Sequence, residues 1–145
     1  MKNVKRKNIF RTADFFSAVA AMMLFVSACE KDNSSPDSGS DDRDKYIRAW
    51  TCNETSQQQG TSTYSITISK DNTSPDGIIV KNFYNLGNAT NTIMIVDGNN
   101  VAINSQNVSG NTISGTGVYH NSSLLTFSFT TYDGITVDTV SISAH

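Results

Sequence analysis

The residues that could carry out nucleophilic or acid–base chemistry are few and widely spaced in this chain of 145 residues. Nucleophilic catalysis needs a base beside a serine or cysteine, and the only histidines are His120, in an expected turn, and His145, the last residue. The carboxylates of residues 45–145 lie mostly in or beside expected turns, where aspartate is favoured for local hydrogen bonds; they are Glu54, Asp71, Asp76, Asp97, Asp133 and Asp138. Because no nucleophile–base pair or carboxylate pair stands out, we predict that the protein is not an enzyme and has no catalytic residue.

Metal ions, cofactors and nucleic acids are not predicted as ligands either. Two cysteines are too few for a zinc site built from cysteine pairs, and a calcium site at Asp71, Asn72 and Asp76 is a minor alternative. Without residues 1–28 the chain has six basic and twelve acidic residues, so no basic face is available to neutralise phosphates. Cys52, with no predicted partner, is expected to be a small buried core residue.

The first 28 residues have the pattern of a secretory signal peptide, expected to be helical. Five of the eleven basic residues lie between Lys2 and Arg11, and an apolar run of twelve residues follows at 15–26. A helix needs roughly 20 apolar residues to span a bilayer, so this run is too short for a lasting transmembrane anchor. The segment therefore predicts export from the cytoplasm.

The end of the apolar run, Val26-Ser27-Ala28-Cys29, resembles the lipobox of bacterial lipoproteins. The resemblance implies that the chain is cut before Cys29 and that this cysteine is diacylated, which attaches the protein to the outer membrane. Several acyl chains at ~0.8 kcal/mol per buried methylene make such an attachment effectively permanent. The alternative is a plain secretory signal followed by an unmodified cysteine.

Residues 29–44 are expected to form a lipidated cysteine and a disordered acidic tether. Residues 30–44 contain six acidic and two basic residues and no large apolar side chain, so they cannot bury enough surface to offset the entropy of ordering. The Glu30-Lys31-Asp32 cluster resembles the acidic export signal of Bacteroidetes-type lipoproteins. That resemblance implies the cell surface, and the alternative is a solvated linker facing the periplasm.

Residues 45–145 are predicted to form one all-β domain. Serine, threonine and asparagine supply 40 of its 101 residues and isoleucine and valine supply 18, against three leucines, a composition that suits strands better than helices. Alternating patterns and turn residues predict eight strands, at 46–54, 63–69, 78–84, 92–96, 100–104, 111–119, 124–132 and 135–144. The expected architecture is an antiparallel up-and-down barrel, because closure removes unpaired edges; a small β-sandwich is the alternative.

The last two strands allow a test of register. If Asp133-Gly134 is a two-residue hairpin turn, Phe127 lies opposite Val140 and Leu125 opposite Ile142, so aromatic and aliphatic faces meet. Asp138 then shares the inward face near the turn, where we expect it at a wet barrel mouth. A bulge that rotates it outward is the alternative.

The segment Lys45-Tyr46-Ile47-Arg48-Ala49-Trp50 resembles the start of lipocalin-like barrels, in which a tryptophan plugs one end. Those barrels have a glycine two residues before the tryptophan, and Arg48 stands there in this chain. With the lipobox and the acidic tether, the chain resembles small lipocalin-like (calycin-type) lipoproteins of Bacteroidetes-type bacteria. The resemblance implies a fold and says little about a ligand.

These observations predict a lipid-anchored envelope protein with a non-enzymatic barrel that acts as a binding or interaction module. The alternative is a structural or accessory subunit that docks on a larger partner through its outer face. A small apolar ligand, a glycan and an envelope protein all remain open as partners. Five aromatic residues are candidates to line a ligand cavity, although a core filled by side chains is favoured over a hollow one: Trp50, Tyr64, Tyr119, Phe127 and Phe129. Asp138-Thr139-Val140 also resembles an O-glycosylation site at Thr139.

Overall fold

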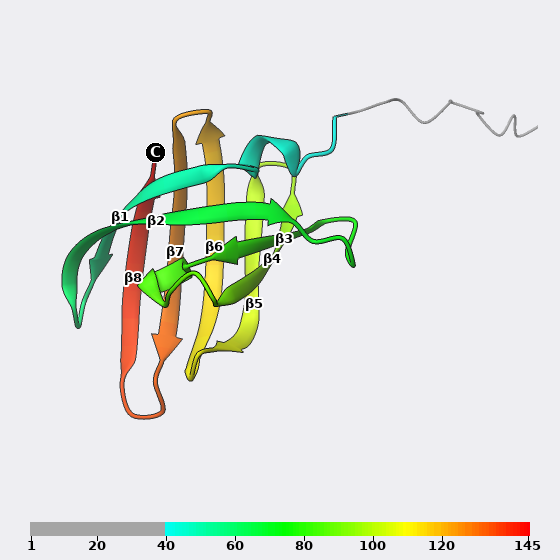
Figure 1. Cartoon of the computed structure of the whole chain (residues 1–145). Helices are drawn as coiled ribbons and strands as arrows, with labels where there is room; N and C mark the ends of the chain where they lie inside the picture. The colour runs from blue at the N-terminus through cyan, green and yellow to red at the C-terminus, as the bar shows by residue number, and fades with distance from the viewer. Residues whose placement is uncertain (1–39) are drawn as a thin grey trace, which may run out of the picture. The chain divides into compact units, whose positions relative to one another are not determined.

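The structure is a computed structural model that describes residues 40–145. These residues form a closed antiparallel barrel in which eight strands follow one another in sequence order (Figure 1). The strands are β1 (Ala49–Ser56), β2 (Gly60–Lys70), β3 (Gly77–Lys81), β4 (Asn91–Asp97), β5 (Asn100–Val108), β6 (Asn111–Asn121), β7 (Leu124–Tyr132) and β8 (Val137–Ala144), with short 3-10 helices η1 (Asp44–Tyr46) and η2 (Phe83–Asn85). Because β1 pairs with both β2 and β8, neither end strand has a free edge. The predicted up-and-down barrel is confirmed, and the sandwich alternative is wrong.

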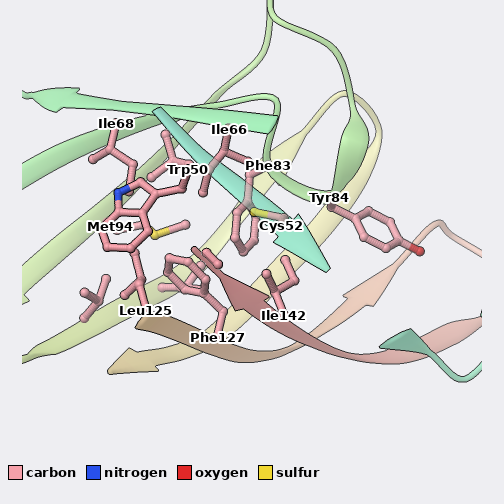
Figure 2. Packing of buried hydrophobic residues seen from close by; sticks show 14 of the residues in the cluster. Trp50, Cys52, Ile66, Ile68, Phe83, Tyr84, Met94, Leu125, Phe127 and Ile142 are labelled. Carbon is pink, nitrogen blue, oxygen red and sulfur yellow. The ribbon is translucent and has the colours of Figure 1, made fainter. Parts of the chain in front are cut away.

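Alternation of inward and outward side chains builds the barrel interior most regularly in β1 and β8. In β1 and β8 every second side chain is buried, and Trp50 and Cys52 face inward as predicted. Phe83 from η2 packs into this interior beside Phe127, with the two ring centroids 5.3 Å apart (Figure 2). The centroid of the Phe129 ring lies 4.7 Å from that of Phe83. The middle of the barrel is therefore packed with aromatic and aliphatic side chains.

Two glycines in β6 leave room for these phenylalanines. Gly117 pairs with Phe127 and Gly115 with Phe129 on β7. A Cβ atom at Gly117 would lie 2.6 Å from the Phe127 ring, and one at Gly115 would lie 2.4 Å from the Ser128 carbonyl oxygen. The glycines are thus required by close approach, and a bulge in β5 interrupts the β5–β6 ladder beside Gly115.

The predicted register of the β7–β8 hairpin is wrong by two residues. Phe127 lies opposite Ile142 and Leu125 opposite Ala144, so the loop holds four residues instead of two. The reason is local: the Asp133 carboxylate accepts hydrogen bonds from the N–H groups of Ile135 (2.8 Å) and Thr136 (2.7 Å), which widens the turn. Since a shift of two preserves the pleat, the inward face is still the predicted one.

One end of the barrel is closed by the segment that precedes β1. Tyr46 is fully buried, its hydroxyl donates to the Gly98 carbonyl (3.1 Å), and its own carbonyl accepts the Trp50 indole N–H (2.9 Å). The Arg48 guanidinium carbon lies 3.5 Å from the centroid of the Trp50 ring, so a cation covers the indole from the position where lipocalin-like barrels have glycine.

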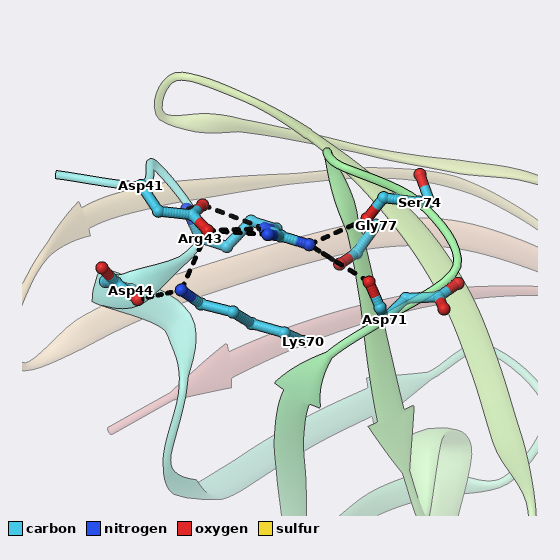
Figure 3. Close-up of polar contacts among 7 residues, drawn as sticks. All are labelled: Asp41, Arg43, Asp44, Lys70, Asp71, Ser74 and Gly77. Carbon is cyan, nitrogen blue, oxygen red and sulfur yellow. Dashed lines mark hydrogen bonds and ion pairs between the residues drawn. The ribbon is translucent and has the colours of Figure 1, made fainter. Parts of the chain in front are cut away.

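The folded domain begins before Lys45, the start expected from composition. Arg43 donates to the carbonyls of Asp71 (3.2 Å), Ser74 (2.8 Å) and Gly77 (3.3 Å) and pairs with the Asp41 carboxylate (2.7 Å), as Figure 3 shows. Lys70 also contacts the carboxylates of Asp41 and Asp44 (2.8 and 2.5 Å). A segment without apolar residues is thus fixed by side-chain hydrogen bonds to backbone carbonyls in and beside the β2–β3 loop. The predicted signal peptide, Cys29 and the start of the tether lie outside the described residues.

Candidate binding site at the open end of the barrel

A pocket of about 260 Å³ lies at the end of the barrel opposite η1. In an up-and-down barrel alternate loops lie at opposite ends, so the β1–β2, β3–β4, β5–β6 and β7–β8 connections meet at this end. Every residue that lines the pocket is polar: Gln58, Gln59, Tyr84, Asn111, Thr131, Asp133, Thr136 and Asp138. We call it the open-end pocket.

Asp138 organises the wall of the open-end pocket. Its side chain is buried, with the residue only 5% exposed, and it accepts hydrogen bonds from the Ser56 hydroxyl (2.5 Å), the Tyr84 hydroxyl (2.9 Å) and the Gln58 N–H (3.1 Å). Burial by itself would raise the pKa of Asp138, but these hydrogen bonds outweigh burial and hold the pKa below its ordinary value. The position at the barrel mouth agrees with the interpretation made from the sequence.

Tyr84 reaches this wall because β3 ends earlier than its apolar pattern suggested. The predicted strand at 78–84 stops at Lys81, and Asn82, Tyr84 and Asn85 have positive φ angles of 60°, 55° and 54°. The Asn82 side chain holds the turn by donating to the Ser65 carbonyl (2.8 Å) and accepting from the Gly87 N–H (2.7 Å). A non-glycine residue in the left-handed region is uncommon, and here it turns the Tyr84 hydroxyl toward Asp138 and Gln59.

Thr131 presents a hydroxyl group that has no protein partner. The residue is 3% exposed, it lines the open-end pocket, and its Oγ1 makes no hydrogen bond within residues 40–145. A buried hydroxyl without a partner costs about 1–3 kcal/mol, so native proteins rarely keep one unless water or a ligand satisfies it. The open-end pocket is the space from which such a partner would approach.

A second buried carboxylate, Glu54, lies inside the barrel. The Tyr64 hydroxyl donates to Glu54 Oε2 (2.5 Å), and Ser62 lies 3.4 Å from Oε1. Burial raises the pKa of Glu54, and the charge of Asp138 adds to this effect. Two carboxylates with opposite pKa shifts are a pattern used in acid–base catalysis, but Glu54 does not line the open-end pocket and its oxygens face protein hydroxyls.

The five aromatic residues predicted as cavity candidates all belong to the packing of the barrel. Trp50, Phe127 and Phe129 are 1%, 2% and 3% exposed, and Tyr64 is buried beside Glu54. Tyr119 is half-buried at the closed end, with its ring centroid 5.4 Å from that of Tyr46. None of the five lines the open-end pocket or the acidic hollow at the closed end that is described next. The structure thus brings polar groups, and not these rings, together around a hollow.

A second, acidic hollow of about 450 Å³ lies at the closed end, lined in part by Asp41, Arg43, Asp76 and Asp97. Hydrogen bonds from Arg43 and Lys70 hold the pKa of Asp41 far below its ordinary value. Asp71, part of the alternative calcium site, accepts hydrogen bonds from Thr73 instead. Within residues 40–145 no group of three or more histidine, cysteine or acidic side chains is arranged to hold a metal ion.

The remaining candidates are isolated from one another. Thr139 is exposed on the outer face of β8, and its carbonyl accepts the Gln57 N–H (3.1 Å). Cys52 is buried, and burial raises the pKa of its thiol to about 12. His120 is exposed and its Nε2 lies 3.0 Å from the Thr126 hydroxyl. Cys29 lies outside the described residues, and among those that are described no helix is long and apolar enough to cross a membrane.

Sequence reasoning found only one residue of the open-end pocket by its place on the inward face, Asp138. The others come from four different loops and strand ends, and polar residues in loops carry no periodic signal. The one available clue was an aspartate on an otherwise apolar inward face, since a buried carboxylate needs donors around it. A scan against protein-family models, a search of curated proteins and a search of solved structures each return no match for this chain.

Proposed function

We propose that this protein is a lipid-anchored envelope lipoprotein, similar to lipocalin-like lipoproteins, whose barrel binds a small molecule in the open-end pocket without catalysing a reaction. The observation that carries the binding proposal is the unpartnered hydroxyl of Thr131 in the wall of that pocket. In small-molecule sites converging polar groups fix the orientation of the ligand, and a carboxylate with a perturbed pKa in a hollow marks a candidate functional site.

Binding is favoured over catalysis because the functional groups of the pocket are already engaged with one another. Asp138 accepts three hydrogen bonds, and Tyr84 both donates to Asp138 and accepts from Gln59 (2.7 Å). A general base must reach a proton of the substrate, whereas these atoms face protein donors. The hydrogen bonds therefore favour a role in holding the pocket wall rigid over a role in proton transfer to or from a substrate.

The position of the pocket supports presentation away from the membrane. The described chain begins at the closed end, where Arg43 fastens it to the β2–β3 loop, and the open-end pocket lies at the other end of the barrel. Acyl chains on Cys29 would therefore hold the barrel by its closed end. On the cell surface, the alternative favoured by the acidic cluster at Glu30–Asp32, the pocket would face the medium.

A blocking variant tests the binding proposal. Ligand-observed NMR on the full-length protein, kept in a polyoxyethylene detergent, is run with a mixture of polyols, amines, carboxylates, phosphates and apolar fragments. We expect at least one class of compound to bind the wild type and to lose binding in Thr136→Trp, because Thr136 lines the pocket and a tryptophan there would fill it. Thr116→Trp, on the exposed outer face of β6, is the matched control. Binding that survives in Thr136→Trp, or the lack of any binding, contradicts the proposal.

The anchor is tested by replacing Cys29 with alanine and fractionating the cells. We expect the variant to leave the membrane fraction, and its retention there would show that Cys29 is not the anchor. Protease added to intact cells should cleave the segment before residue 40 if the domain is on the surface. Full protection would place the domain on the periplasmic side.

An exposed apolar hairpin favours a second candidate function, docking on a larger envelope partner. Ile135, Val137 and Tyr132 at the β7–β8 turn are 89%, 58% and 43% exposed, and neighbouring apolar side chains on a surface often mark an interaction site. Changing all three to serine should abolish cross-linking to any partner in intact cells while leaving the pocket unaltered. Unchanged cross-linking would rule out this hairpin as the docking surface.

A further inference from the structure

We infer that the ligand of the open-end pocket is a neutral polyhydroxyl molecule, most simply a single six-membered sugar ring. The inference rests on the proposed function, since it names the chemical class of the ligand for that same site. It follows from three properties of the pocket: the sign of its charge, its mixture of hydrogen-bond donors and acceptors, and its size.

The charge of the pocket disfavours anions. Two carboxylates, Asp133 and Asp138, line it, and no lysine, arginine or histidine does so among the residues that the structure describes. Both carboxylates have a pKa below the ordinary value, Asp133 because the N–H groups of Thr136 and Ile135 donate to it. They are therefore ionised at neutral pH and would repel a phosphate, a sulfate or a carboxylate.

The hydrogen-bonding groups of the pocket match hydroxyl groups better than ammonium groups. The amides of Gln58 and Asn111 each offer donors and an acceptor, and the hydroxyls of Thr131 and Thr136 offer both as well. A ligand hydroxyl also donates and accepts, so it can satisfy either side of each group. An ammonium ion only donates, so it would leave the amide and hydroxyl donors of the pocket without partners.

Asp138 does not require a cation to neutralise it. Its two oxygens already accept three hydrogen bonds from protein donors, and this arrangement stabilises its charge. The unpartnered atom that the pocket offers to a ligand is the buried Thr131 hydroxyl, a neutral group. The site is therefore prepared for a polar, uncharged molecule.

The volume sets the size of the ligand. The pocket has a volume of about 260 Å³. This is just below the range of about 300–1,000 Å³ that holds drug-sized ligands, and it suits one sugar ring of about twelve non-hydrogen atoms. An oligosaccharide could place only its terminal ring inside.

The test uses saturation-transfer NMR and titration of the full-length protein with methyl pyranosides of the glucose, galactose, mannose and N-acetylglucosamine series. Glycoside detergents are avoided because they would compete, and the protein is kept in a polyoxyethylene detergent. Ethylamine and inorganic phosphate serve as the cationic and anionic probes. We expect at least one pyranoside to bind with a Kd of about 1 mM, the range for a few hydrogen bonds, and neither ion to bind.

Two pocket variants locate the binding. Gln58→Ala and Asn111→Ala each remove hydrogen bonds to the ligand and should weaken binding by about three- to tenfold. Gln57→Ala and Asn104→Ala remove the same side-chain types from exposed positions outside the pocket and should leave Kd unchanged. Equal melting temperatures of the four variants show that the fold is kept.

The outcomes separate the two proposals. If ethylamine or phosphate binds and Gln58→Ala weakens that binding, the sugar inference is overturned while the binding function stands. If a pyranoside binds but none of the pocket variants affects it, the site is elsewhere and the inference also fails. If none of these probes binds at about 50 mM and the broader mixture gives no ligand blocked by Thr136→Trp, both proposals fail.

Discussion

Replacement of Asp138 by asparagine should destabilise the barrel, because the three donors around this side chain are arranged for a carboxylate. The amide oxygen of asparagine can still accept from the hydroxyls of Ser56 and Tyr84, but its NH₂ group then faces the Gln58 N–H. One hydrogen bond to a charged group, worth about 1.5–3 kcal/mol, is lost, and two others become neutral bonds of roughly half the strength.

Asparagine carries no charge, so the free-energy cost of burying the carboxylate disappears in the variant and offsets part of this loss. Since the pKa of Asp138 is lowered overall, the hydrogen bonds outweigh the burial of the charge, and the net effect must still be destabilising. We expect the free energy of unfolding to fall by about 2 kcal/mol and Tm by roughly 10 °C at pH 7. Asp97→Asn, at an exposed position, should stay within about 0.5 kcal/mol of the wild type.

The same pair of proteins gives a pH test with a definite sign. A carboxylate whose pKa is lower in the folded state stabilises the fold at every pH above its unfolded value of about 3.9. That contribution is lost as the pH falls through the lower, folded pKa. Below about pH 4, where Glu54 is protonated in both proteins, the difference between wild type and Asp138→Asn should therefore shrink as the pH falls.

Guanidinium unfolding of the full-length protein measures the free energy of unfolding at pH 7 and its dependence on pH. The transition is followed by the fluorescence of the single tryptophan. Trp50 is 1% exposed, so its emission reports on the closed core. A loss below about 0.5 kcal/mol at pH 7 would show that Asp138 does not hold the open end together. A difference that grows as the pH is lowered below about 4 would refute the argument from its pKa.

The other predictions concern three separate features of the barrel. Gly117→Ala places a Cβ 2.6 Å from the Phe127 ring, and we expect a loss of about 1–3 kcal/mol in guanidinium unfolding; a neutral result would mean that the ring has room to move. Burial raises the pKa of Glu54, so the wild type loses stability as the pH rises through that raised value, whereas Glu54→Gln keeps an acceptor for Tyr64 without the charge. The Tm of Glu54→Gln should exceed that of the wild type by a few degrees at pH 8 and equal it at pH 4. A Tm of Glu54→Gln below that of the wild type at pH 8 would contradict this prediction. Arg43→Met removes the donors to three carbonyls in and beside the β2–β3 loop and should speed hydrogen exchange there but not in β6 and β7. Exchange rates in the loop equal to those of the wild type would show that the Arg43 hydrogen bonds are dispensable.

The strands and their inward faces could be predicted because each face repeats every two residues. In β2 the buried Tyr64, Ile66 and Ile68 alternate with exposed hydroxyl residues, so burial of one face follows from the pleat. The number of strands followed from the turn residues between them, and the barrel followed from the argument that closure removes unpaired edges. The two-residue error in the β7–β8 register has a different origin, since the side chain of Asp133 sets the turn, and either loop length preserves the pleat.

The candidate site could be predicted only through one residue. Asp138 stood out as a carboxylate on an apolar face, but its partners Ser56, Gln58 and Tyr84 lie 82, 80 and 54 residues away in sequence. Tyr84 looked like the end of a strand, and only the positive φ angles after Lys81 direct its hydroxyl to the mouth. Such contacts depend on barrel closure, which no local pattern encodes.

The amino-acid sequence alone indicates that residues 45–145 form β-strands with one apolar face, because alternation and β-branched composition act locally along the chain. It also supplied the prediction of an anchor at Cys29, which depends on a short linear motif. The location of the open-end pocket follows from the folded barrel and from no single segment of the sequence. Packing of Phe83 against Phe127 and Phe129 fills the centre of the barrel, while four loops bring polar groups together at one end. Both the filled centre and the polar open end depend on which side chains from distant parts of the chain come into contact. Those contacts are set when the barrel closes by pairing of β1 with β8.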